Sequence, residues 1–155
     1  MNYAKAQKDV LAKLVKNSKA VINCITGGAT ACLIVDGVVG YIFPEDANWL
    51  DVEKIEATTN ITALRLPLCV SDEILTPTEN LIDKGGYLAR EYKKERYGGS
   101  AESVYIQEQF VKNFDAPTFY QALDKPRSII AIRETTQLEG EHLVGFVMPF
   151  HLKED

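Results

Sequence analysis

The sequence predicts a single α+β domain over residues 1–155, with a mainly antiparallel sheet and two helices on one face. Three patterns indicate this class. A helical period opens the chain, Asp36-Gly37 lies between two apolar runs, and the most apolar stretch, Leu143–Leu152, comes almost at the end. The expected element order is α-β-β-β, a variable β region, and α-β-β-β. With 46% apolar and 25% charged residues, the composition is that of an ordinary globular domain.

The first expected element is an amphipathic helix over Tyr3–Lys19, with apolar side chains at helical spacing. Its lysines gather on the opposite side, and Asp9 is the only acid in the segment. In a protein of net charge −5, this basic face has two interpretations. The more common one is a solvated face whose Lys stems cover the helix, and the other is a helix that faces phosphate. The lysines are Lys5, Lys8, Lys16 and Lys19, with Lys13 at the margin.

Three strands are expected next, over residues 20–26, 29–35 and 38–43. The Asp36-Gly37 pair is the strongest short hairpin signal, because both central residues of a tight turn need positive φ. Gly27-Gly28 is interpreted as a plain turn, since no phosphate-binding motif follows it.

The middle of the chain predicts further strands. Alternating apolar residues favour strands over Leu50–Glu56 and Ala63–Val70, and the segment Ser71–Asn80 is expected to be a loop. The segment Asn80–Glu95 is interpreted as a hairpin around a Gly-Gly turn, although Leu88–Lys94 fits a short helix equally well. Basic residues and tyrosines alternate over 84–97, which is typical of a polar hairpin and, less often, of a nucleic-acid-binding segment.

The last third predicts one helix and three strands. Helical spacing favours a helix over Val104–Phe114, N-capped by Ser103. Strands are expected over Thr118–Ala122, Ser128–Glu134 and Leu143–Leu152, with the last two antiparallel.

The sequence offers little for catalysis. His142 and His151 are the only histidines and lie outside any metal-ligand spacing, so we expect no metal, no cofactor and no enzymatic activity. The three cysteines form no CxxC pair, which favours reduced thiols and a cytoplasmic protein. The chain has no run of 18 apolar residues, so no membrane association is expected. One hypothesis for function is an enzyme whose active site no sequence pattern reveals. Two others come from a resemblance at the end of the chain.

The end of the chain resembles a known family. The segment Phe146-Val147-Met148-Pro149-Phe150-His151-Leu152 is similar to the C-terminal tail of the bacterial DNA sliding clamp, the ring-shaped processivity factor of replicative polymerase. The likeness extends backwards as a pattern of one helix and two strands at similar spacing, over about a third of the chain.

The resemblance implies a domain of two α-β-β-β halves with both helices on the inner face of a ring. The basic side of the first helix would then contact the backbone of double-stranded DNA without reading its sequence. The family's tail lines an apolar pocket that accepts short peptides of polymerases and other partners. Carried onto this chain, the pocket residues are Met148, Pro149, Phe150 and Leu152.

The chain also departs from the family. It has length for one domain where a clamp subunit has three, so a ring would need several copies and a homo-oligomer is expected. His151 stands where the family has Arg, and Lys112 is the only cation of the second expected helix. These departures favour a clamp-like module of a phage or mobile element that binds DNA or docks replication proteins. The alternative is an interaction or inhibitor protein that binds a host protein and not DNA.

Overall fold

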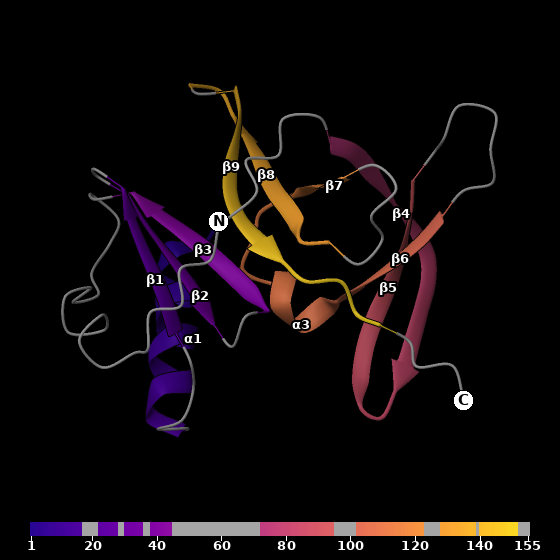
Figure 1. Ribbon diagram of the computed structural model, residues 1–155, viewed down its shortest axis with the longest axis horizontal. Coiled ribbons are helices and arrows are strands. Elements are labelled where there is room, and N and C mark those ends of the chain that lie inside the picture. Colours follow the sequence, from indigo (N-terminus) through magenta and orange to yellow (C-terminus); the bar gives the residue numbers. More distant parts are fainter. Residues whose placement is uncertain are drawn as a thin grey trace.

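The computed structural model describes residues 1–16, 22–27, 30–35, 38–44, 72–94, 102–122, 128–138 and 140–151 (Figure 1). Within these residues the fold is α+β, with nine strands in one antiparallel sheet of order β1-β2-β3-β9-β8-β7-β4-β5-β6. The elements are α1 (Tyr3–Lys16), β1 (Ile22–Gly27), β2 (Thr30–Val35), β3 (Val39–Pro44), β4 (Asp72–Lys84), β5 (Tyr87–Lys94), β6 (Glu102–Gln107), α3 (Glu108–Val111), β7 (Thr118–Ala122), β8 (Ile130–Thr136) and β9 (Gly140–Val147).

Strands β3 and β9 join the first three strands to the rest of the sheet. Only three residue pairs make this junction, and they centre on Gly40 opposite Phe146. Gly145 lies at its end, where an added Cβ would collide with the carbonyl oxygen of Gly40 and the ring of Phe114. The absence of a side chain at Gly145 therefore lets β3, β9 and the aromatic core approach closely.

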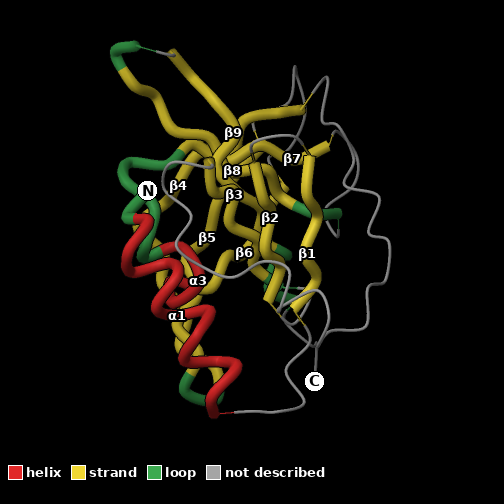
Figure 2. Tube along the Cα trace, turned by 90° about the vertical axis from the view of Figure 1, so that its left-hand side faces the viewer, coloured by secondary structure: helices red, strands yellow, loops and turns green. Residues whose placement is uncertain are grey.

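Helices α1 and α3 lie on the same side of the sheet (Figure 2). Ala6 and Val10 are fully buried on the inner side of α1 and pack on the main core, which Phe110 of α3 also contacts. Strands β3 and β8 contribute alternate residues to this core, as period-two strands covered on one face should, and β7 and β9 contribute Phe119, Val144 and Val147. The packing explains why the amphipathic pattern of α1 correctly predicted a helix.

The predicted helix over Val104–Phe114 is wrong for most of its length. The structure has strand β6, in which Val104 and Ile106 are buried and Tyr105 between them is half-buried. The register of β6 against β5 runs from Lys94 opposite Glu102 to Ala89 opposite Gln107. Pairing with β5 satisfies the backbone of β6, and this outweighs the helical spacing of its apolar residues. Only the four residues of α3 are helical.

The N-cap assigned to Ser103 is also wrong. Ser103 lies inside β6, opposite Lys93 of β5. The residue that precedes α3 is Gln107, which is extended and makes no side-chain capping hydrogen bond.

The predicted loop Ser71–Asn80 is wrong, because β4 begins at Asp72. The first four residues of β4 pair with β7, and its later residues pair with β5. Pro77, which signalled a loop, lies at an irregularity of register between Pro77 and Leu81. A bulge of this kind accommodates a residue that has no N–H to donate.

Several hairpins are confirmed. Strands β2 and β3 are antiparallel around the Asp36-Gly37 segment, and β8 pairs with β9. Strands β4 and β5 form the expected hairpin, with Gly85 and Gly86 at φ of 64° and 86°. The helical alternative for Leu88–Lys94 is therefore wrong. The predicted strands Leu50–Glu56 and Ala63–Val70 lie outside the described residues.

The last strand is shorter than predicted, since β9 ends at Val147. Beyond Val147, two backbone hydrogen bonds join the chain to the sheet. The N–H of Met148 donates to the carbonyl oxygen of Val38 at 2.8 Å, and the N–H of Phe150 donates to that of Tyr105 at 2.7 Å. The tail therefore crosses from β3 to the edge strand β6.

Candidate nucleic-acid interface

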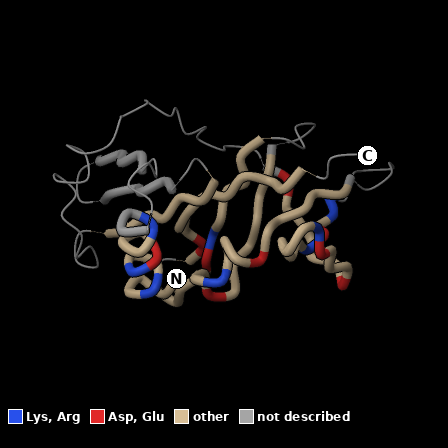
Figure 3. The backbone as a smooth tube through the Cα atoms, turned by 90° about the horizontal axis from the view of Figure 1, so that it is seen from below, with Lys and Arg blue, Asp and Glu red and all other residues tan. Residues whose placement is uncertain are grey.

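The outward face of α1 carries the lysines singled out in the sequence. Lys5, Lys8 and Lys13 are exposed, while Ala6 and Val10 on the opposite side are completely buried. Figure 3 shows Lys positions in blue on the coil of α1, beside the N label. Lys16 is the last residue of α1, and Lys19 lies outside the described residues. The three exposed side chains make α1 a basic surface at which a polyanion can bind.

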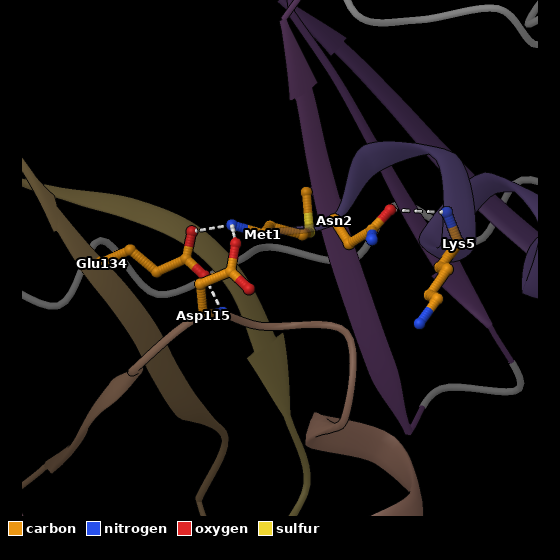
Figure 4. Close-up of polar contacts among 5 residues, drawn as sticks. All are labelled: Met1, Asn2, Lys5, Asp115 and Glu134. Atoms are coloured by element: carbon orange, nitrogen blue, oxygen red, sulfur yellow. Dashed lines mark hydrogen bonds and ion pairs between the residues drawn. The ribbon is translucent and has the colours of Figure 1, made fainter.

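Asn2 determines where α1 begins. Its side-chain oxygen accepts a hydrogen bond from the N–H of Lys5 at 3.0 Å, which is the geometry of an N-cap (Figure 4). The N–H of Asn2 in turn donates to the carbonyl oxygen of Asn113 at 2.7 Å. The start of the helix is therefore attached to the turn that follows α3.

The α-amine of Met1 connects this same end of α1 to the sheet. It forms an ion pair with the carboxylate of Glu134 on β8 and lies 3.1 Å from a carboxylate oxygen of Asp115 (Figure 4). Glu134 is only 6% exposed and also accepts a hydrogen bond from the N–H of Asp115. The buried carboxylate thus has two partners that position α1 over β8.

A polar link in the middle of α1 reaches the residues after α3. Oδ2 of Asp9 accepts a hydrogen bond from the amide of Asn113 at 2.8 Å and lies 3.7 Å from Nζ of Lys112. The Asn113 amide also donates to the hydroxyl oxygen of Tyr41 at 3.3 Å. Burial raises the pKa of Tyr41; the Asn113 hydrogen bond lowers it, and the Asp9 charge raises it. Because its partners offset its charge, Asp9 opposes an approaching anion less than an unpaired acid would.

The contribution of α3 to the charge of this side is close to neutral. Glu108 pairs with Nε of Arg90 on β5 at 2.8 Å, and Lys112 pairs with Asp9. The excess positive charge therefore comes from α1. Lys112 was noted in the sequence as the lone cation of its segment. Its contact with α1 could not be read from the sequence, because it depends on the chain returning across the sheet.

Three of the predicted peptide-pocket residues, Met148, Pro149 and Phe150, lie on the tail between Val38 and strand β6. Pro149 is buried, Met148 and Phe150 are half-buried, and Leu152 lies outside the described residues. The ring of Phe150 is 6.4 Å from that of Tyr87, between centroids. Tyr87 is 52% exposed and belongs to the tip of the β4–β5 hairpin, so the tail contacts a partly exposed aromatic side chain.

The tip of this hairpin is an exposed apolar surface that the sequence did not mark as a site. Its members are Leu81, Tyr87 and Leu88, which are 43%, 52% and 46% exposed. Tyr87 and Leu88 lie beyond the part of β5 that pairs with β6, which begins at Ala89, and Leu81 lies opposite Arg90. We call these three residues the hairpin tip.

Among the described residues, His, Cys, Asp and Glu form no group of three or more that could hold a metal ion. In the same part of the chain, none of the helices has the length and apolar character needed to cross a bilayer.

The comparisons with known proteins found no match. No family model and no curated protein matches the sequence, and no solved structure matches the fold.

Proposed function

We propose that the protein is a clamp-like, non-enzymatic module that binds the backbone of double-stranded DNA through α1 as part of a homo-oligomer, and that docks replication proteins. The observation that carries this proposal is the exposed row of Lys5, Lys8 and Lys13 on a helix held firmly against an antiparallel sheet. A rigid helix presents its cations at fixed spacing, so phosphate contacts need little further ordering. In this function, residues 1–155 act as one domain.

The arrangement of the elements supports the same proposal. One α-β-β-β run, α1 to β3, precedes a second run, α3 to β9, and both helices lie on one side of the sheet (Figure 2). In such a layout a ring of several copies would place the helices inside and the sheets outside. The overall negative charge then belongs to the outer surface, and the basic α1 faces the enclosed DNA.

The test combines oligomeric state with DNA affinity. Light scattering after size exclusion should give a multimer, and fluorescence anisotropy with a random-sequence duplex should give binding that weakens steeply with salt. The variant K5E/K8E/K13E should lose this binding while its circular dichroism stays native, because the three side chains are exposed.

The matched control is K84E/K93E, which reverses charges on the β4–β5 hairpin instead. It should keep duplex affinity within about twofold, since a charge at the protein surface acts mainly within a Debye length of about 10 Å. Loss of duplex binding in the control alone would show that the basic, Tyr-rich hairpin, and not α1, contacts DNA. A strict monomer without duplex binding at low salt would overturn the proposal.

The second candidate function is that of an interaction or inhibitor protein, of phage or mobile-element origin, that binds a host protein and not DNA. The hairpin tip favours it, because Leu81 and Leu88 are apolar, exposed and on the same face of a projecting hairpin, with exposed Tyr87 on the other face (Figure 1). Exposed apolar clusters of this kind are common at protein interfaces.

The two functions make opposite predictions for two variants. Under the second function, L81S/L88S should abolish recovery of a specific protein partner, while K5E/K8E/K13E should not change it. Duplex binding that survives L81S/L88S and is lost in the lysine variant would favour the DNA-binding module.

A further inference from the structure

A cavity of about 190 Å³ lies between α1 and α3, above the start of β3. The two helices that line it differ in length. At about 1.5 Å per residue, the 14 residues of α1 extend about 21 Å, whereas the four residues of α3 extend about 6 Å. The second half of α1 therefore projects past α3 (Figure 2).

The floor of this cavity is apolar and partly aromatic. Val10 of α1, Val39 and Tyr41 of β3, and Phe110 of α3 all line it. Val10, Val39 and Tyr41 are at most 5% exposed and belong to the main core, so their positions are fixed by packing. A preformed apolar floor favours an apolar ligand body, because binding removes apolar surface from water without reordering the protein.

The size of the cavity limits the ligand. A cavity of about 150 Å³ in a protein core accommodates one benzene molecule. A volume of about 190 Å³ therefore holds a single six-membered ring with a short substituent, and it is too small for a dinucleotide or a long acyl chain.

The rim determines the charge of the ligand. Lys13 of α1 and Lys112 after α3 line the cavity, and Asp9 is the only acid that does so. Asp9 already accepts from Asn113 and pairs with Lys112, so its charge is offset from within the protein. The two ammonium groups outnumber the single carboxylate, which favours an anion at the rim.

We propose that this cavity binds a small aromatic monocarboxylate, with its ring on the Val10–Val39–Phe110 floor and its carboxylate between Lys13 and Lys112. The ring fills the apolar volume, and the carboxylate accepts charge-assisted hydrogen bonds from two side chains that rise from opposite walls. The site shares Lys13 with the outward lysine row, but it faces the groove between the helices, and binding of a small ligand there does not depend on the DNA proposal.

The first test uses the unaltered protein and three matched probes. Phenylacetate, the neutral phenylacetamide and acetate are titrated into ¹⁵N-labelled protein and followed by amide chemical shifts. Phenylacetate should shift the amides of Val10, Val39 and Phe110 saturably, with a Kd of about 1 mM. Phenylacetamide should bind at least about tenfold more weakly, and acetate should leave the floor amides unchanged.

Two variants then test the geometry. Lys112→Gln should weaken phenylacetate binding about tenfold, whereas Lys84→Gln, a distant lysine on the β4–β5 hairpin, should leave it unchanged. Val38→Phe, which adds volume at the cavity edge, should abolish binding by filling the space. Equal affinity for phenylacetate and phenylacetamide, or the absence of saturable shifts at the floor amides, would overturn the proposal, and neither result depends on a variant that must fold.

Discussion

The side-chain amide of Asn113 donates a hydrogen bond to Oδ2 of Asp9 across 104 residues of sequence. Asn113 is only 2% exposed, and the same amide reaches the hydroxyl of Tyr41 on β3. One side chain thus links the first helix, the segment after α3 and strand β3. Its position explains how the basic face of α1 is held at a defined orientation.

Replacing Asn113 with Ala should lower the free energy of unfolding by about 2 kcal/mol, because the buried Tyr41 hydroxyl and the half-buried Asp9 carboxylate lose their donor. Urea unfolding followed by circular dichroism measures the change. The matched control is Gln109→Ala, an exposed amide one turn earlier, which should change stability by less than about 0.5 kcal/mol. Equal effects of the two variants would contradict the role assigned to Asn113.

Glu134→Gln should lower the free energy of unfolding by about 3 kcal/mol, more than Asn113→Ala does. The substitution removes the negative charge that pairs with the buried α-amine of Met1. The comparison is Asp115→Asn. Its carboxylate contacts the same amine at 3.1 Å but is 78% exposed, so we expect a loss below about 1 kcal/mol. Thermal unfolding in parallel scans ranks the two variants, and the reverse ranking would show that the exposed acid is the main partner.

Gly145→Ala should destabilise the protein by about 3 kcal/mol or prevent folding, since the added methyl group meets the Gly40 carbonyl oxygen and the Phe114 ring. Gly140→Asn serves as its control. Gly140 has φ of 65° with nothing near its Cβ position, and Asn tolerates that conformation. Soluble yield and denaturant midpoints report the difference. A Gly145→Ala protein of native stability would show that β3 and β9 do not approach this closely.

High pH should unfold the protein in a window defined by Tyr92. Burial raises the pKa of Tyr92 to about 12, against about 10 in an unfolded chain. Between pH 10 and pH 12 the folded state binds the proton and the unfolded state does not. Stability is therefore fully present below about pH 10 and falls as pH rises through 12. Tyr92→Phe should flatten this part of the stability profile, and an unchanged profile would assign alkaline unfolding to other groups.

Salt dependence provides a quantitative prediction for DNA. Each phosphate that a lysine neutralises contributes about −0.9 to the slope of log K against log salt concentration. Reversing Lys5, Lys8 and Lys13 should therefore reduce the magnitude of the slope by at least about 2.7. Anisotropy titrations at several salt concentrations give the slope. An affinity loss with an unchanged slope would mean that the lysines do not contact phosphate.

Local sequence signals correctly predicted the elements whose pattern and environment agree. The amphipathic stretch from Tyr3 is a helix because one face of it packs on the core. The Gly85-Gly86 turn is a hairpin because glycine adopts the positive φ values that it requires. For the candidate interface, helical periodicity alone sufficed to place Lys5 and Lys8 on the basic face with Lys13 at its margin, and all three are exposed.

Segments whose conformation depends on pairing with another strand were mispredicted. In the stretch 103–107, residues spaced for a helix became strand β6 because β5 lies beside it and satisfies its backbone. In β4, Pro77 indicated a loop, but the bulge between Pro77 and Leu81 accommodates a proline, which has no N–H to donate. In both cases the deciding partner was another strand, and no local propensity encodes its position.

The sequence by itself determined the α+β class, the positions of α1 and the main hairpins, and the basic face of α1, because these follow from residue order within one element. Only the tertiary structure decided the junction of β3 with β9, the contact of Asp9 with Asn113 and Lys112, and the cavity between α1 and α3. Each of these brings together residues far apart in the chain. Their proximity depends on strand pairing and core packing, which are properties of the whole fold.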